Sequence, residues 1–433
     1  MQKSSPSSRA RSGNVSKTTV GIALLLTGVL FCQAKNTAEP NNPNLHSGTD
    51  SERIEAALTY AKRNNLPLEI TARKPDSLAN REYWLIDRAI LIPGDFEVRL
   101  IDCKIKLSDT SRDNFIRSAN CGRGIETIHP LANIRIIGSG KAVLEGADHP
   151  RSTGDSAKRI GVNTFGTDAG KTQESQNGDW RNIGILLAEV NGFRLENLVL
   201  SDSHCWAISL EYCRTGTVRN IQFQSNGTKT IDGKSEKILN QDGLDLRRGC
   251  SNIDIDGIYG HTGDDLVALT AIPDRPNGTS PAGKLDKTMV SALDLPSSRD
   301  AIEHITIRNV KGFCAGGHHV VRFLNSSGIK MRQIHLENVE DLSPEGLRAF
   351  ATVKIGDSNP NWGGVTPLGD TTEFTIKNVR SRAKSAVKIA GSLSDSTISG
   401  VTNLYSNGKT FLFESGQRNV RNVTIQQEEA NKK

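Results

Sequence analysis

The 433-residue sequence contains no dense run of Lys or Arg, although its formal net charge is +6 at pH 7. Chains that bind nucleic acids gather basic residues into a patch or stripe, so the scattered charge does not indicate a nucleic-acid partner. No second long apolar run follows the first 34 residues, and we therefore expect no membrane span. An acidic polysaccharide is compatible with the net charge, but the charge alone does not argue for one.

The cysteines also lack any metal-binding spacing. Six follow Cys32 in the chain: Cys103, Cys121, Cys205, Cys213, Cys250 and Cys314. They form no CxxC pair and no zinc pattern, so no metal or other cofactor is expected. An exported protein can pair its cysteines, but buried free thiols are the simpler interpretation. Cys213 and Cys250 hold equivalent positions in neighbouring repeats and are expected to stack; whether they bond stays open.

The N-terminal segment is typical of an exported protein. Basic residues from Lys3 to Lys17 precede the apolar run TVGIALLLTGVLF, and CQA follows it. This order matches a secretory signal peptide over residues 1–34, cleaved after Ala34, and the apolar run is too short to span a membrane comfortably. We therefore expect a secreted or periplasmic protein.

A linker and a helix come next. Residues 35–50 are rich in Asn, Ser, Thr and Pro and are predicted to be a linker. In the following segment, DSERIEAALTYAKRNN, Ile54, Ala57 and Ala61 fall on one face of a helix, which predicts an amphipathic helix.

Beyond this helix, short β-branched runs recur between Gly, Asn, Asp and Ser. The repeating segments include IGILLAEVNGFRLENLVLSDSHC, WAISLEYCRTGTVRNIQFQSNG and DGLDLRRGCSNIDIDGIYGHTG, with a period of roughly 22 to 24 residues. The frame of leucine-rich repeats is absent, and propeller blades need about twice this period. We therefore predict an all-β fold, a right-handed parallel β-helix forming a single domain over residues 51–427, with the short N-terminal helix capping its first strand edge.

Polar insertions interrupt the repeats at residues 151–181, 273–300 and 357–371. Insertions in a solenoid tend to fall on one side, where they shape a groove. Trp180 and Trp362 lie in or beside these insertions and either stack on a sugar or anchor the loops.

The segment NQDGLDLRRGCSNIDIDGIYGHTGDD concentrates aspartate. Asp242 and the Asp264–Asp265 pair lie one repeat apart, so we expect them on neighbouring coils. Nearby carboxylates resist joint ionisation, so one retains a proton near neutral pH while another stays ionised. Cleavage of a glycosidic bond needs this division between acid and base. Turn chemistry explains each aspartate singly, but not their joint spacing.

This stretch resembles the polygalacturonase-type glycoside hydrolases of family 28, which belong to the pectin-lyase-like parallel β-helix superfamily. The family carries N-T-D-G and, about one coil later, G/Q-D-D; here NQDG spans Asn240 to Gly243 and GDD spans Gly263 to Asp265. The segment SHCWAISLEYCRTGTVRNIQF also resembles the coil that precedes N-T-D-G in the family.

The resemblance extends over roughly residues 50–425, and its central part is specific. It implies that Asp242, Asp264 and Asp265 are the catalytic group of an inverting glycosidase acting on a polysaccharide or oligosaccharide. One aspartate would act as the acid, and the other or others would position water.

Two family motifs are altered. In place of G-H-G the nearest match is GGHH, in which His318 and His319 alternate along a strand, so only one is expected to face the cleft. Arg322 matches the arginine of the family's R-I-K, whereas Leu324 replaces its lysine. Losing that positive charge weakens the case for plain polygalacturonate. We predict that substrate contacts come from Arg322 and from His318 or His319. Asn240 is grouped with them, chiefly as a brace for its turn.

Other interpretations stay open. Asp245, two residues after Gly243, is expected to pack at the ladder edge rather than in the cleft. A calcium-dependent polysaccharide lyase would use the clustered carboxylates as ligands and Arg247 or Arg248 as the base. A non-catalytic carbohydrate-binding β-helix would explain the altered motifs. We expect a monomer in each case.

Overall fold

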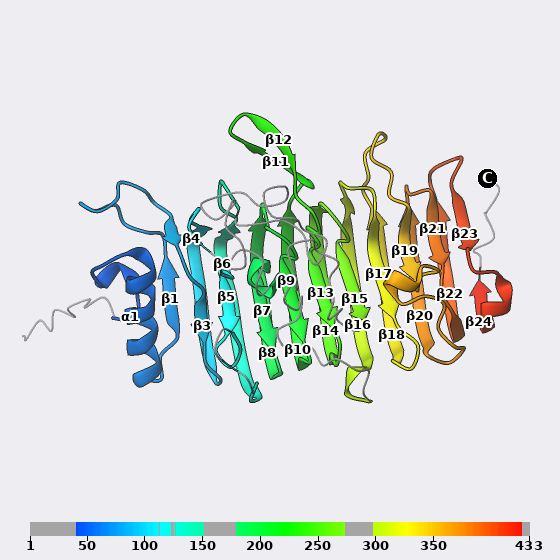
Figure 1. The fold of residues 1–433 in the computed structure, drawn as a ribbon, viewed down its shortest axis with the longest axis horizontal. Helices are drawn as coiled ribbons and strands as arrows, with labels where there is room; N and C mark the ends of the chain where they lie inside the picture. Colours follow the sequence, from blue (N-terminus) through cyan, green and yellow to red (C-terminus); the bar gives the residue numbers. More distant parts are fainter. Residues whose placement is uncertain are drawn as a thin grey trace, which may run out of the picture. The chain divides into compact units, whose positions relative to one another are not determined.

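Two long parallel sheets run through the chain, and each strand pairs with the equivalent strand of the next coil. The computed structural model describes residues 40–111, 113–122, 125, 127–150, 179–272 and 298–426. The expected signal peptide, residues 1–34, lies outside them. Residues 39–433 form one compact unit, in which Figure 1 shows the coils following one another from α1 to β24. The chain is a right-handed parallel β-helix, as its repeats predict.

The first sheet has 12 strands and contains the long strand of each coil. Its strands are β1 (Leu68–Thr71), β2 (Trp84–Ile86), β4 (Phe96–Leu107), β6 (Leu131–Glu145), β8 (Val190–Ser201), β10 (Arg214–Gln224), β14 (Ser251–Thr262), β16 (Ile302–Cys314), β18 (Met331–Asp341), β20 (Thr371–Ser381), β22 (Leu393–Asn403) and β24 (Val420–Gln426).

The second sheet has 10 shorter strands, and its outer face carries the candidate site described below. They are β3 (Ile90–Ile92), β5 (Ile116–Ser118), β7 (Ile185–Ala188), β9 (Ile208–Glu211), β13 (Leu244–Arg247), β15 (Val267–Ala271), β17 (His319–Asn325), β19 (Ala351–Ile355), β21 (Ser385–Ile389) and β23 (Lys409–Phe413).

The remaining elements connect or cap the coils. A hairpin of β11 (Thr228–Ile231) and β12 (Lys234–Lys237) stands out from the stack (Figure 1). The helices are α1 (Asp50–Arg63) and the short 3-10 turns η1 (Pro43–Leu45), η3 (Asp179–Asn182), η4 (Ser298–Asp300), η5 (Pro360–Trp362) and η6 (Gln417–Asn419).

The core lies between the two sheets and consists of apolar columns that run from coil to coil. Val218 of β10, for example, pairs with Leu195 on one side and Ile255 on the other, and all three are fully buried. Arg194 pairs with Thr217, an offset of 23 residues that confirms the predicted period. β-branched side chains suit such columns because they pack well on a pleated surface.

The cysteines behave as small core residues. All six that follow Cys32 are buried and unbonded. Cys213 and Cys250 directly precede the paired residues Arg214 and Ser251, so they stack on neighbouring coils as expected. Their thiols donate to the carbonyl oxygens of Leu187 and Leu210 rather than to each other.

A ladder of asparagines bends the long strands. Asn220, Asn309, Asn338 and Asn378 each adopt a positive φ between 52° and 60°, a conformation that asparagine tolerates better than most residues. Their side chains bond from coil to coil; for example, Asn220 donates to Asn197 and Asn378 donates to Asn338 (2.8 and 3.0 Å). The ladder therefore satisfies the polar groups at each bend.

Helix α1 covers the N-terminal edge of the coils, as predicted. Ile54, Ala57 and Ala61 are buried in the main core, and the helix contacts β1, β2 and β3. Thr49 and Glu52 form a capping box at its N-terminus. Residues 40–49 fall in the expected linker, yet they also pack here: Asn41 Nδ2 donates to the Pro67 carbonyl (2.8 Å).

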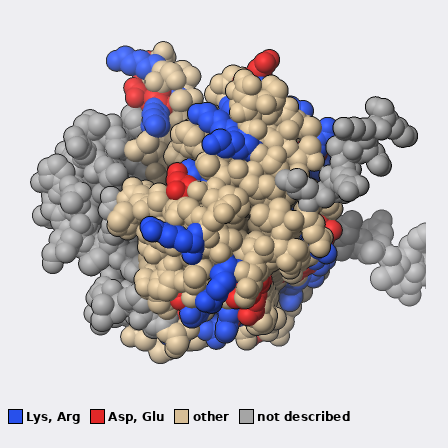
Figure 2. All heavy atoms as spheres, turned by 90° about the vertical axis from the view of Figure 1, so that its right-hand side faces the viewer, with Lys and Arg blue, Asp and Glu red and all other residues tan. Residues whose placement is uncertain are grey.

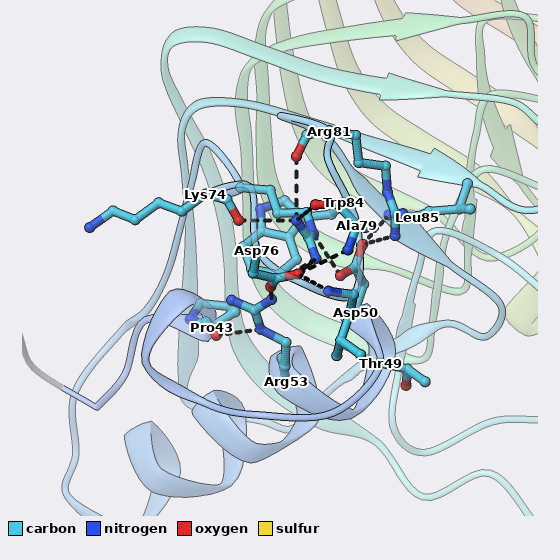
Figure 3. Close-up of polar contacts among 12 residues, drawn as sticks. Pro43, Thr49, Asp50, Arg53, Lys74, Asp76, Ala79, Arg81, Trp84 and Leu85 are labelled. Atoms are coloured by element: carbon cyan, nitrogen blue, oxygen red, sulfur yellow. Dashed lines mark hydrogen bonds and ion pairs between the residues drawn. The ribbon is translucent and has the colours of Figure 1, made fainter.

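A buried network of charges fixes this cap to the first coil (Figure 3). Asp50 accepts hydrogen bonds from Arg73 (2.8 Å), Arg81 (2.7 Å) and the backbone of Leu85 (2.8 Å). The guanidinium of Arg53 lies over the Trp84 ring, 5.0 Å from its centroid. Because Asp50 joins the helix to residues on three later segments, it holds the cap in one orientation.

The C-terminal end is finished differently. Figure 2 faces the end that carries β23 and β24 and shows separate groups of Lys and Arg with fewer Asp and Glu. Phe411, Phe413, Val420 and Val423 are only partly buried against the core there. Charged side chains around a strand edge discourage further strands from pairing with it. Within the described residues, no helix is long and apolar enough to cross a membrane.

We predict that Asp50→Ala lowers the stability of the coil stack by about 1–3 kcal/mol, because it leaves the buried Nε of Arg73 and the Leu85 amide without their acceptor while Arg73 keeps its pair with Asp76. Denaturant unfolding followed by circular dichroism measures the change. The control is Glu55→Gln, which breaks a half-exposed pair with Arg88 and should cost less than about 1 kcal/mol. Equal midpoints for the two variants would contradict a supporting role for the buried network.

Candidate active site

A groove of about 820 Å³ crosses the outer face of the second sheet. Strands β13, β15, β17, β19 and β21 contribute to it, so its long direction runs from coil to coil. All seven site residues predicted from the sequence line this one groove: Asn240, Asp242, Asp264, Asp265, His318, His319 and Arg322.

The turn before β13 is held in place by a buried glutamine. Gln241 Oε1 accepts from the Gly227 backbone (2.8 Å), and its Nε2 donates to the Ser203 carbonyl (2.5 Å). Asn240 lies in the same turn with a φ of 53° and lines the groove. These contacts fix the backbone from which the Asp242 side chain enters the groove.

The turn before β15 depends on close contact between glycines. A Cβ atom on Gly263 would lie 2.5 Å from the Cα of Gly227, and a Cβ atom on Gly316 would lie 2.1 Å from the Gly263 carbonyl oxygen. Both distances are too short for any side chain, so glycine is required at each position. Asp264 and Asp265 therefore follow a turn packed tightly between the turns of the neighbouring coils.

The ladder brings Asp242 and Asp265 side by side. The Gly243 amide donates to the Asp265 carbonyl (2.9 Å), and the Leu266 amide donates to the His319 carbonyl (3.3 Å). Asp242, Asp265 and His319 therefore occupy one column on three successive coils, which are about 4.8 Å apart.

Asp265 is almost fully buried, and positively charged or donating groups surround its carboxylate. Oδ1 accepts from the His319 backbone amide (3.0 Å) and contacts His319 Nδ1 (2.8 Å), while Oδ2 accepts from Arg322 (3.2 Å). Arg322 also donates to Asp357, whose Oδ2 accepts from Lys354 (2.6 Å). This chain of charges fixes the orientation of Asp265.

Asp264 is the most exposed of the three predicted catalytic aspartates, with 18% of its side chain accessible. Its Oδ1 lies 3.3 Å from His318 Nδ1. One ligand atom from each of Asp264, Asp265 and His318 lies within 4.8 Å of the others, so these groups can exchange a proton or share a cation.

The surroundings separate the acidities of the aspartates. Burial raises the pKa of Asp242 well above its usual range, and the charges of Asp245, Asp264 and Asp265 raise it further. Burial also opposes ionisation of Asp265, but its interactions with His319 and Arg322 outweigh this, so its pKa falls below the usual range. Burial lowers the pKa of His319 to about 4, so this ring is neutral at pH 7 and donates its Nδ1 hydrogen to Asp265.

The expectation that only one histidine faces the cleft is wrong. Both line the groove, because β17 begins at His319 and His318 belongs to the preceding turn, where strand alternation does not apply. The pair also lies directly beside the aspartates, since β15 pairs with β17 despite the long insertion between them in the sequence.

Two features of the groove were missed in the sequence. Leu324 stands in the groove as expected, but Lys354 pairs with Arg322 in the next coil and Lys388 pairs with Lys354. The positive charge that Leu324 removes is thus present on adjacent coils. Asp245 does not merely pack at the ladder edge, because it lines the groove and its Oδ2 is buried without a hydrogen-bond partner.

The two loop tryptophans have different positions. Trp180 is buried in a cluster outside the second sheet, with the Arg117 guanidinium 5.0 Å from its ring centroid. Trp362 is 39% exposed and lines the groove, with the Arg322 guanidinium 5.4 Å from its ring centroid. Of these two tryptophans, only Trp362 presents its ring to a ligand in the groove.

Comparisons with known proteins reach the chain only through solved structures. No family model and no curated protein matches it. A hyperthermoactive exopolygalacturonase from Thermotoga maritima is 14% identical with a TM-score of 0.44, covering 89% of this chain and 91% of the other. The surface protein and adhesin PfbA of Streptococcus pneumoniae is 9% identical with a TM-score of 0.39, covering 88% and 94%. Likenesses this distant carry no functional argument, and the fold rests on the strands themselves.

Arg322→Gln is expected to raise the pKa of Asp265, because it removes the positive charge next to Oδ2. Carbon NMR of the aspartate carboxyl groups, followed from pH 2 upward, shows the rise: Asp265 of the wild type stays ionised through this range, whereas Asp265 of the variant should titrate within it. Arg322→Lys is the control, since it keeps the charge and should return the pKa toward its low value. An unchanged pKa in Arg322→Gln would show that Arg322 does not set the charge of Asp265.

Proposed function

We propose that the chain is a glycoside hydrolase that cleaves an acidic polysaccharide or oligosaccharide in the groove of the second sheet. The observation that carries the proposal is the column of carboxylates from neighbouring coils, in which Asp242 has a raised pKa and Asp265 a lowered one. Carboxyl groups with opposed acidities are what hydrolysis of a glycosidic bond requires.

The three aspartates divide the work by their surroundings. Burial raises the pKa of Asp242, and the neighbouring carboxylates raise it further, so Asp242 takes up a proton more readily than Asp265 in the free protein. Asp265, fixed by His319 and Arg322, keeps its negative charge, orients the attacking water and accepts the proton that this water loses. We assign proton transfer to the leaving oxygen to Asp264 in its protonated form, because it is the most exposed of the three and has His318 beside it. Exchange with solvent then removes the proton from Asp265 and returns one to Asp264.

The basic side of the groove supports an acidic substrate. Arg322, Lys354 and Lys388 form one column on successive coils and line the groove. Such a column can bind carboxylate or sulfate groups along a polymer that lies across the strands, and these groups would replace Asp357 and Glu414, which pair with Lys354 and Lys388 in the free protein (2.6 Å each). Polygalacturonate is therefore the first substrate to test, together with other acidic plant and algal glycans.

Export is part of the proposal and rests on the sequence of residues 1–34, where basic residues precede a short apolar run. A polymeric glycan is then met outside the cytoplasm. The action on the anomeric centre is proposed to be inverting, as the family resemblance implies, and NMR of the first product anomer distinguishes inversion from retention.

We predict that Asp264→Asn lowers turnover by about 10²–10⁴-fold while glycan binding persists, because the variant keeps its shape but cannot donate a proton. Release of reducing ends and isothermal calorimetry measure the two properties. Asp256→Asn is the matched control: like Asp264, Asp256 is next to a glycine in the same segment, but it lies on the long strand β14 and accepts a hydrogen bond from Asn309. Full activity in Asp264→Asn, or an equal loss in Asp256→Asn, would contradict the assignment.

A calcium-dependent lyase is the second candidate, favoured by the proximity of Asp264, Asp265 and His318. Against it, Arg322 already occupies Oδ2 of Asp265, where it would repel a cation. Products of a lyase absorb in the ultraviolet through a new double bond, and EDTA should abolish their formation. Products without this absorbance, formed equally well in EDTA, support hydrolysis.

A carbohydrate-binding protein without turnover remains the alternative if the altered family motifs have removed catalysis. Binding of the glycan panel by both the wild type and Asp264→Asn, with no bond cleaved by either, would identify this case.

A further inference from the structure

The groove has a closed end beside the aspartates. Among the described residues, its lining extends through β13 to Lys388 of β21, but on the N-terminal side it stops at Trp206. Trp206 precedes β9 by two residues as Asp242 precedes β13, and Ile208 of β9 pairs with Leu244 of β13. Trp206 is therefore one coil from Asp242 and two coils from Asp265, or roughly 5 and 10 Å.

A second apolar cluster builds this end. On the outer face of β7, Leu186 and Ala188 are fully buried beneath side chains from the turns around them: Cys121, Trp180, Ile183, Cys205 and Trp206. Farther along the same face, the groove is open. The boundary between the covered and the open part of the sheet falls at Trp206.

Strand β9 continues the rows of paired residues that line the groove, but its residues are covered. Ser209 pairs with Asp245, yet it is completely buried, and Glu211 of the same strand is also completely buried. The Arg247 guanidinium lies 4.5 Å from the centroid of the Trp206 ring and holds the wall from the groove side. Among the described residues, the outer face of the sheet beyond Trp206 is therefore covered, and the groove does not continue along it.

Unpaired polar atoms lie next to the wall. Among the described residues, Asp245 Oδ2 and Arg247 Nε are buried without a hydrogen-bond partner, and both residues line the groove. Buried polar groups are usually satisfied, so an acceptor and a donor at the closed end favour a bound water or a ligand group that completes them once the side chains above them move. The last unit of a glycan suits them, because it carries a hydroxyl where an internal unit carries the next glycosidic bond.

We propose that the protein acts on chain ends: the terminal sugar lies against Trp206 above Asp245 and Arg247, and the polymer leaves along Arg322, Lys354 and Lys388. The inference rests on the proposed glycosidase function and adds an exo mode of cleavage to it. The aspartates then cut close to the terminus, and each cleavage releases one short product of fixed length.

The product pattern tests this mode. Polygalacturonate and the other acidic glycans of the panel are digested with the wild type, and products are separated by size from the first turnovers onward. We expect one short product at all times, with the viscosity of the polymer falling slowly for the number of bonds cleaved. Blocking one end of the polymer chemically should abolish cleavage when that end enters the groove.

Substitutions at the closed end test whether Trp206 causes the single short product. Trp206→Ala opens the closed end and should add internal cleavage, seen as products of several lengths and a faster fall in viscosity. Arg247→Ala removes the support of Trp206 and serves as a second variant if Trp206→Ala fails to fold by circular dichroism. Trp362→Ala, farther along the groove, is the control; it should weaken binding without changing the product pattern.

The outcomes separate the two levels of the proposal. Fragments of many sizes from the wild type at the earliest times would overturn the exo mode and leave the hydrolase. If Trp206→Ala and Arg247→Ala both fold and give the same products as the wild type, Trp206 is not the cause of the product pattern. No cleavage of any glycan by the wild type would overturn the proposed function, and the exo mode with it.

Discussion

Main-chain hydrogen bonding between successive coils sets the register on which the groove depends. Side chains alternate across a strand, so a slip of one residue would turn every groove residue toward the core. The Gly243 amide on the Asp265 carbonyl and the Leu266 amide on the His319 carbonyl keep this register at the site itself. The close packing of Gly263 against Gly227 and Gly316 leaves no space for an alternative.

The same register brings several buried carboxyl groups close together, where burial and their mutual repulsion oppose ionisation. Asp242 and Asp245 are buried, and their pKa values are raised first by burial and then by neighbouring charges. A raised carboxyl pKa makes folding less favourable as the pH rises above the value of the unfolded chain. His319 and Arg322 together outweigh burial at Asp265, whereas the charge of Arg322 offsets it only in part at Asp242 and Asp245, so negative charge is accepted at one aspartate and resisted at the others. Opposed acidities of this kind cluster at functional sites, and structural ion-pair networks also produce them.

The fold and the column of aspartates could be predicted from the sequence because both depend on the spacing of residues along the chain. Apolar alternation and the repeat length identify the coils, and Asp242 and Asp264 differ by about one repeat. The basic column could not be found this way, because Arg322 and Lys354 are 32 residues apart (354 minus 322), more than one predicted repeat, although the two residues pair. The turn position of His318 was missed because a strand boundary cannot be fixed to one residue from periodicity. Burial of Trp180 depends on contacts from other coils, which spacing does not reveal.

The two ends of the coil stack are not equivalent, and this has a consequence for how copies of the chain meet. Helix α1, fixed by Asp50, covers the backbone groups of β1, whereas β24 ends the described stack at the opposite side. A parallel solenoid that left both ends bare would present complementary edges and could grow head to tail into a filament. Because α1 packs against β1, it occupies the place at which the last strand of another copy would have to pair, so the described coils carry a helix at one end and a strand edge at the other.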